Sequence, residues 1–295
     1  MIGGLLRRFI GGAPAAPPSA LSEALPEVLE LAPGGEVRVV MPQVANGYAA
    51  LVNTFQGYFI FNHYDTGVGW QLRSFNAYEV EQTRVLDRMA RAAPPDPVIL
   101  DIGANIGVFT LLFAKIAGLG GLVHAYEAQR VMFHMLAGSM ALNSMDNVHC
   151  HHLAVGAHAG TARLPRLNYR SDAGFGSVEL NREHQSDAKQ QAIGGIFDEV
   201  PMASIDALAL PRVDMMKIDV EGMEAEVLAG AMQTILAQHP LIYLEYLKGD
   251  KQALGRTLQE AGYVLFEVPE NFICVPVGHP GMQTLSEGMT PWAAG

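Results

Sequence analysis

The sequence predicts an α/β fold in which a mostly parallel sheet is covered by helices on both faces. Three observations support this prediction. From residue 98 onward, short apolar runs with strand-like composition alternate with apolar segments of helical period. A glycine-rich turn at residues 103–107 joins the first of these strands directly to a helix. Two extended runs near the C-terminus follow each other closely, as in a closing hairpin that adds one antiparallel strand.

We expect three parts along the chain. Residues 1–20 are rich in Pro, Ala and Gly and predict a flexible leader, because a signal peptide would need an unbroken apolar run. Residues 21–75 predict a β-rich extension, with extended runs at 36–40 and 57–61. Residues 76–295 form the main domain, which begins with a helix that lies within 75–92 and ends before two prolines.

The remaining elements of the main domain follow from the same periodicity. We expect strands at 98–100, 122–126, 148–155, 213–220 and 241–246, helices at 106–117, 131–143, 222–238 and 252–261, and a hairpin of 263–268 and 272–277. Residues 164–200 are polar and do not fit the alternation. A segment of this length predicts a lid, a binding loop or disorder, and the alternative is a solvated insertion without a role.

Composition excludes several classes of protein. The chain has 295 residues, of which 49% are hydrophobic and 17% charged, as in globular proteins. A net charge of −11 without a Lys/Arg cluster argues against a nucleic-acid partner. Two cysteines, Cys150 and Cys274, cannot form a disulfide framework and favour a reducing, cytoplasmic location. No stretch reaches the roughly 18 apolar residues of a membrane span, so no transmembrane segment is expected.

The glycine-rich turn predicts a cofactor site. The strand ends at Asp101, and Gly103, Asn105 and Gly107 follow before the helix. In an open α/β sheet, nucleotide-like ligands bind at this strand end. The spacing departs from the dinucleotide pattern, which needs a glycine where Asn105 stands. Asp101 would repel a pyrophosphate, whereas it suits the ammonium group of S-adenosylmethionine, directly or through water.

An acid at the end of the next strand supports a nucleoside ligand. Glu127 stands 20 residues after Gly107, where an acid hydrogen-bonds ribose hydroxyls in nucleotide-binding folds. The alternative is an ordinary solvated glutamate. Because both candidate cofactors carry a ribose, this residue does not distinguish them.

A second cluster of charges lies on the strand predicted at 213–220. Lys217, Asp219 and Glu221 alternate with apolar residues and therefore share one face. Charges on a central strand are costly to bury unless they pair or emerge at the strand end, where the ligand is expected. The cluster therefore predicts a functional site, and a structural ion-pair network is the alternative.

At these residues the sequence resembles the FkbM-type methyltransferases, a branch of the class I enzymes that depend on S-adenosylmethionine. The segments that carry the resemblance are LDIGANIGVFT at 100–110, Tyr126-Glu127, residues 204–208, DMMKIDVEGMEAEVLAG at 214–230 and residues 240–245. The match runs from about residue 78 to residue 266. The polar insertion before Val200 and the His149–His152 run depart from it.

The resemblance implies a Rossmann-like, seven-stranded sheet and O-methylation of a sugar, a glycan or another hydroxylated metabolite. By motif position, it implies that the cofactor is held by Asp101, Gly103, Ala104, Asn105, Gly107 and Glu127, with Asp219 near the methionine moiety or the acceptor. The expected partner is a small-molecule or glycan acceptor, and a homo-oligomer is compatible with the sequence.

Transfer of a methyl group to oxygen requires a base that removes the proton of the acceptor hydroxyl. Asp219 and Glu221 are the favoured candidates, and the sequence does not choose between them. Glu245, at the end of the following strand, is a further candidate. Lys217 is expected to orient the acids, or to act as the base if burial lowers its pKa.

For several histidine and aromatic residues, a functional role competes with an ordinary structural one. His149 and His151 would face one side of a strand and His152 the other, and no acid pair completes a metal site, so we expect packing or solvent-facing roles and no metal. Tyr78 and Glu79 precede the turn and are candidates to line the cofactor pocket.

Two other functions compete with methyl transfer. A nicotinamide-dependent oxidoreductase would use the same fold, but the glycine spacing argues against it. A non-catalytic binding module would be marked by a filled pocket or by loss of an acid, yet Asp101, Glu127 and Asp219 are present.

Overall fold

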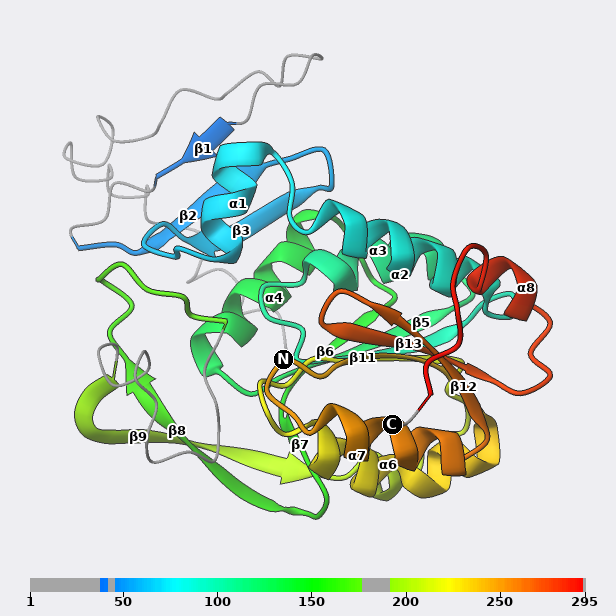
Figure 1. The fold of residues 1–295 in the computed structure, drawn as a ribbon. Helices are drawn as coiled ribbons and strands as arrows, with labels where there is room; N and C mark the ends of the chain where they lie inside the picture. The colour runs from blue at the N-terminus through cyan, green and yellow to red at the C-terminus, as the bar shows by residue number, and fades with distance from the viewer. Residues whose placement is uncertain (1–37, 42–45, 177–191, 294–295) are drawn as a thin grey trace, which may run out of the picture.

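The computed structural model describes residues 38–41, 46–176 and 192–293 (Figure 1). A seven-stranded sheet forms its centre. In spatial order the strands are β12 (Tyr263–Val268), β13 (Asn271–Pro276), β11 (Leu241–Glu245), β10 (Met215–Ile218), β4 (Val98–Ile102), β5 (Leu122–Glu127) and β6 (Val148–His152). All pairs are parallel except those that β13 makes with its two neighbours. The expected seven-stranded, mostly parallel sheet with one antiparallel strand is confirmed.

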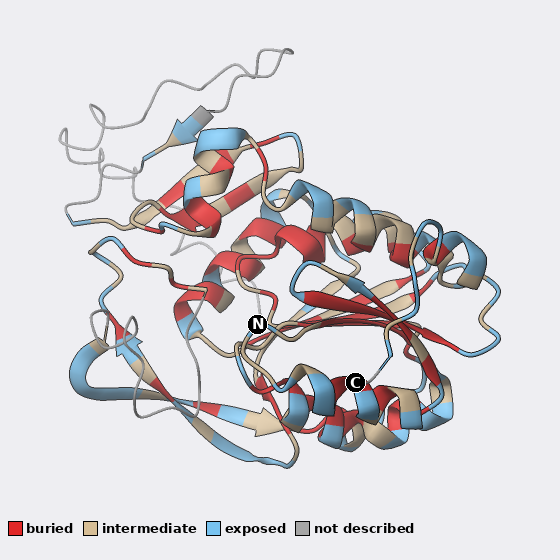
Figure 2. Ribbon diagram, in the orientation of Figure 1, coloured by how far each residue is buried: buried red, intermediate tan, exposed pale blue. Residues whose placement is uncertain are grey.

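Helices cover both faces of this sheet (Figure 1). One face carries α2 (Val80–Ala92), α3 (Val108–Ala117), α4 (Arg130–Leu142) and the short α8 (Met282–Leu285), and the other carries α6 (Glu224–Gln238) and α7 (Lys251–Glu260). Successive residues of β10 serve opposite cores, since Met215 packs with the α2–α3 side and Met216 with the α6–α7 side. The central strands are accordingly the most deeply buried part of the molecule (Figure 2).

The N-terminal extension is a second, smaller sheet. Its antiparallel strands are β1 (Arg38–Val40), β2 (Ala49–Asn53) and β3 (Tyr58–Asn62). β3 packs on α4, where the Asn143 side chain accepts from Tyr58 N–H at 3.1 Å and donates to its carbonyl at 2.7 Å. The expected leader at residues 1–20 lies outside the described residues.

One helix of the extension was not expected from the sequence. The helical segment predicted within 75–92 corresponds to α2, but α1 (Val68–Phe75) precedes it. Two glycines at the start of α1 weaken its helical signal. Its first turn is instead held by Asp65, whose carboxylate accepts from the N–H groups of Gly67 (3.0 Å) and Gly69 (2.8 Å). The helix therefore depends on a contact that its own periodicity does not show.

A third sheet runs partly through residues 164–200, so this segment is not a loop throughout, and its role as a lid or binding loop stays a prediction. β8 (Gly160–Leu167) and β9 (Ala192–Ala203) form an antiparallel pair, and β7 (Ala154–Val155) adds to β9. Much of the pair is exposed, so its residues lack the apolar alternation by which strands are predicted. The strand expected at 148–155 is split between β6 and β7. A 3₁₀ turn, η2 (Asp206–Leu208), follows β9.

No helix among the described residues has both the length and the apolar character needed to cross a bilayer.

Candidate functional site

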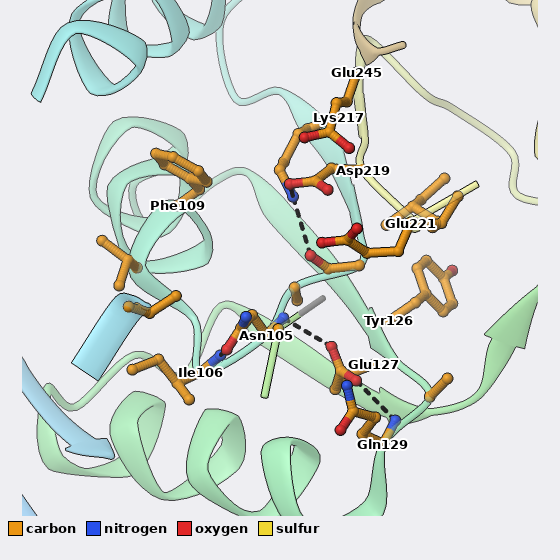
Figure 3. Close-up of a pocket in the computed structure, with 18 of the residues that line it drawn as sticks. Asn105, Ile106, Phe109, Tyr126, Glu127, Gln129, Lys217, Asp219, Glu221 and Glu245 are labelled. Carbon is orange, nitrogen blue, oxygen red and sulfur yellow. Dashed lines mark hydrogen bonds and ion pairs between the residues drawn. The ribbon is translucent and has the colours of Figure 1, made fainter. Parts of the chain in front are cut away.

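A pocket opens at the carboxyl ends of β4, β5 and β10. It leaves about 1220 Å³ free of protein atoms, part of it open to solvent. Figure 3 shows that its polar side chains gather at two ends. Asn105, Glu127 and Gln129 lie at one end, here called the nucleoside end. Lys217, Asp219, Glu221 and Glu245 lie at the other, here called the acidic end.

Glycines allow the strand ends to meet closely. Gly103 has φ +80°, and a Cβ built on it would lie 1.8 Å from the carbonyl oxygen of Asp219. The N–H groups of Gly103 and Ala104 both donate to the carbonyl of Tyr126 at 3.0 Å. Gly107, with φ +93°, begins α3 and does not line the pocket, whereas Gly103, Ala104 and Asn105 do. The turn thus presents its backbone to the pocket and ties β4, β5 and β10 together.

Glu127 is held in place by backbone donors. Its two carboxylate oxygens accept from the N–H groups of Asn105 (2.8 Å) and Gln129 (2.7 Å), as drawn in Figure 3. Burial raises the pKa of Glu127 to about 7. Glu127 lines the pocket, and each of its oxygens can accept a further hydrogen bond, which suits hydroxyl donors such as those of a ribose.

Lys217 connects two strands at the acidic end. Its ammonium lies 3.2 Å from Asp219 Oδ2 and 3.4 Å from Asp101 Oδ1, and it donates to the Gly103 carbonyl at 3.0 Å. Burial alone would lower the pKa of Lys217, but the charges of Asp219 and Asp101 outweigh it and raise that pKa. A base role for Lys217 required a lowered pKa, so the structure favours its role as an orienting residue.

Asp101 lies behind the pocket wall. It is fully buried, and its Oδ2 accepts from the Thr110 hydroxyl at 2.6 Å. Unlike the other expected cofactor residues at the start of the turn, it is not among the lining residues. Its contacts are those of a support for Lys217, and a contact with the cofactor through water stays a prediction.

Two further carboxylates complete the acidic end. Glu221 Oε2 pairs with Lys248 at 2.5 Å. Burial raises the pKa of Glu221, and the pairing with Lys248 opposes that shift. Glu245 has a buried Oε2 without a hydrogen-bond partner among the described residues. Burial and the negative charges of Asp219 and Glu221 raise the pKa of Glu245 to about 9.

The extension and the insertion supply walls that sequence reasoning largely missed. Gln71 and Tyr78 line the pocket from the extension side, which for Tyr78 agrees with the sequence. Gly174 and Gly176 line it from the insertion, and a Cβ on Gly176 would lie 2.6 Å from Asn105 Nδ2. Gln129 is fixed to this segment by donating to the Phe175 carbonyl at 2.7 Å. Neither Gln71 nor Gln129 was expected from the sequence, and the one signal that could have found Gln129 is its place two residues after the strand-end acid Glu127.

The histidines lie apart from the pocket lining. His149 and His151 group with His124 of β5, whose Nδ1 lies 3.1 Å from His151 Nε2. His152 faces the other way, near the Ala128 carbonyl and against the Phe133 ring. Within the described ranges, no three His, Cys, Asp or Glu side chains are arranged to hold a metal ion.

The residues at the nucleoside end fit S-adenosylmethionine. The backbone of Gly103, Ala104 and Asn105 lines the pocket, and Glu127 offers acceptors for two ribose hydroxyls. Gln129 Oε1 is buried without a partner, which leaves an acceptor for a ligand N–H. The acid-rich far end suits a cation, and the sulfonium of this cofactor is one.

Comparison with protein families agrees with this geometry. Residues 101–265 match the methyltransferase FkbM domain. "Methyltransferase sdnD" of Sordaria araneosa is 29% identical over 161 residues, which are 46% of this chain and 61% of that protein. "Methyltransferase 1" of Beauveria bassiana is 26% identical over 187 residues, which are 58% of this chain and 74% of that protein.

The solved structures that align with this chain are more distant in sequence. A methyltransferase FkbM from Methylobacillus flagellatus is 16% identical with a TM-score of 0.43, covering 70% of this chain and 53% of that one. A methyltransferase from Geobacter sulfurreducens is 14% identical with a TM-score of 0.43, covering 70% and 85%. The chain thus spans less than two thirds of sdnD and of the Methylobacillus protein.

Proposed function

Because the chain belongs to the methyltransferase FkbM family, whose domain spans residues 101–265, we propose that it methylates a hydroxyl group with S-adenosylmethionine. The acceptor is a sugar, a glycan or another hydroxylated metabolite. One observation carries the proposal. The glycine turn that fits the cofactor and the carboxylates that can take a proton open into the same pocket, from β4 and β10 respectively.

At the nucleoside end, Glu127 accepts from the ribose hydroxyls and Gln129 Oε1 accepts from a ligand N–H. The backbone of Gly103, Ala104 and Asn105 shapes the floor under the ligand. The bound cofactor supplies an electrophilic methyl group. The protein aligns the acceptor oxygen with that methyl group and removes its proton.

Glu221 is the proposed base. Its pKa is raised, which makes it a stronger proton acceptor than an ordinary carboxylate, and Lys248 contacts Oε2. Asp219 is bound to Lys217 and serves to orient the acceptor. Glu245, with a pKa of about 9, carries its proton at neutral pH and is suited to donate a hydrogen bond.

These roles predict different kinetic losses. Glu221→Gln removes the proton acceptor, so kcat falls by about 10²–10⁴ with little change in cofactor affinity. Asp219→Asn removes an orienting charge and affects both kcat and acceptor KM. Equal, full activity in both variants would contradict the assignment of the acidic end.

The class of reaction is tested by isothermal titration with S-adenosylmethionine, S-adenosylhomocysteine and NAD, followed by an acceptor screen that begins with sugars. We expect micromolar binding of the first two ligands only, and a product with one added O-methyl group. Binding of NAD alone would support the oxidoreductase alternative. Binding of none, in a folded sample, would support a non-catalytic module.

A further inference from the structure

Tyr78 reaches the pocket from outside the matched family domain. It lies between α1 and α2, lines the pocket, and packs its ring against Phe109 with centroids 5.7 Å apart. Over the described part of the chain, its hydroxyl has no hydrogen-bond partner, although Asp219 and Glu245 act on it electrostatically. The phenol is therefore a donor available to a ligand beside the acidic end.

Gln56 holds the backbone of Tyr78 from both sides. In the turn between β2 and β3, its Oε1 accepts from Tyr78 N–H at 2.8 Å, and its Nε2 donates to the Tyr78 carbonyl at 3.1 Å. The same Nε2 donates to the Thr83 hydroxyl at 3.1 Å. Gln56 itself does not line the pocket. The contact therefore couples the extension sheet to the position of one pocket residue.

The charge of the acidic end limits what binds beside Tyr78. Asp219, Glu221 and Glu245 line it, and Lys217 is the single cationic side chain among the described lining residues. Lys217 is already shared between Asp219 and Asp101. Lys248 pairs with Glu221, and Glu245, whose pKa is raised to about 9, carries its proton at neutral pH. The carboxylates of Asp101, Asp219 and Glu221 therefore face two lysines, and one net negative charge remains at the acidic end. An acceptor with a carboxylate or phosphate would meet this excess negative charge, whereas an uncharged polyol would meet acceptors for its hydroxyls.

We propose that the acceptor is an uncharged polyol and that Tyr78 donates a hydrogen bond to one of its oxygens, with Gln56 as the positioning residue. This inference rests on the proposed O-methylation and adds its substrate class and a specificity residue. The extension thereby belongs to the acceptor site, although it lies outside residues 101–265.

The test uses the full chain with matched pairs of neutral and anionic acceptors. The first pair is phenyl β-D-glucoside and phenyl β-D-glucuronide, in which a carboxylate replaces the hydroxymethyl group of the glucoside. The neutral member of each pair is expected to have at least a tenfold higher kcat/KM. In Tyr78→Phe, KM for the best neutral acceptor rises about three- to tenfold, the loss expected of one uncharged hydrogen bond, while kcat changes less than twofold. Tyr58→Phe, which removes the same atom from β3, leaves KM unchanged.

The role of Gln56 is tested by a double-mutant cycle. Gln56→Ala raises acceptor KM in the native background but has no further effect on KM in Tyr78→Phe, because it acts through the phenol. A purely structural loss would lower the melting temperature and raise KM equally in both backgrounds. That result would overturn the positioning role.

Binding supplies a second readout. With S-adenosylhomocysteine present, titration of the best neutral acceptor should show the same three- to tenfold weakening in Tyr78→Phe. Preference for the anionic acceptors, or unchanged binding in this variant, overturns the inference and leaves O-methylation standing. Failure of the native protein to methylate any acceptor, despite binding cofactor, overturns the proposed function and the inference together.

Discussion

The ammonium of Lys217 lies 3.2 Å from Oδ2 of Asp219, with only 3% of the lysine side chain exposed. The same ammonium lies 3.4 Å from the fully buried Asp101 on the neighbouring strand. One cation thus compensates carboxylates from β10 and β4 beneath the pocket. The acidic end is organised around this lysine, so its removal has consequences for stability as well as for activity.

Lys217→Met is expected to destabilise the protein by about 3–5 kcal/mol, because it leaves the carboxylate of Asp101 buried without a cation. Unfolding in urea measures the change. Lys251→Met is the control, since Lys251 pairs with Glu267 at an exposed site and should lose less than about 1 kcal/mol. The double variant Lys217→Met/Asp101→Asn should recover part of the loss. Similar losses for the two lysines would contradict the burial argument.

Gly103→Ala is expected to cost more than about 3 kcal/mol and to abolish cofactor binding, because the new Cβ would overlap the backbone of Asp219. Gly262→Ala separates strain from overlap. Gly262 also has a positive φ, +88°, but nothing lies within 4 Å of its Cβ position, so only about 1–2 kcal/mol should be lost. Thermal unfolding and titration with S-adenosylhomocysteine measure both effects. A Gly103→Ala protein with native affinity would refute the close approach.

The affinity for S-adenosylhomocysteine is expected to depend on the ionisation of Glu127. Its pKa is raised by burial to about 7, so its carboxyl is mostly protonated at pH 6 and mostly ionised at pH 8. The ionised form is the better acceptor for ribose hydroxyls, so affinity should increase about tenfold across this range. Titration calorimetry at several pH values measures it. Glu127→Gln should bind more weakly and without this pH dependence, and a parallel pH profile in the variant would exclude Glu127 as the cause.

Glu245 should make the protein less stable as pH rises. Its folded pKa is raised from 4.5 to about 9, so the folded state holds a proton that the unfolded state has lost. The stability contributed by the protonated group is complete below about pH 4.5 and is lost progressively as pH rises to about 9. The melting temperature of Glu245→Gln should therefore exceed that of the native protein increasingly between pH 5 and pH 9. Glu267→Gln, at an exposed salt bridge, should show no such trend, and a constant difference for Glu245→Gln would contradict the raised pKa.

The alternation of strands and helices could be predicted from the sequence, because each of these elements buries apolar residues that recur with its own period. The turn at 103–107 and Glu127 could likewise be predicted to lie together, because the carboxyl ends of neighbouring parallel strands meet at one edge of the sheet. Strand alternation applies only to Lys217, because β10 ends at Ile218 and Glu221 lies in a turn with φ 57°. Asp219 and Glu221 reach the same edge because they directly follow the strand end. Sequence therefore determined the family, the sheet and the position of the pocket.

Only the tertiary structure decided how the pocket is completed. Gln56 meets Tyr78 across 22 residues, and Lys248 meets Glu221 across a strand and a helix, so neither contact leaves a periodic signal. Many residues of β8 and β9 are exposed and polar, so their sequence does not show the alternation that predicts strands. The segment that follows β8 nevertheless places Gly176 against Asn105. The pattern of apolar residues within one helix or strand shows which of its faces is buried, so the sequence determined these elements. The contacts of Gln56 with Tyr78 and of Lys248 with Glu221 form only when separate elements pack together, so the tertiary structure decided them.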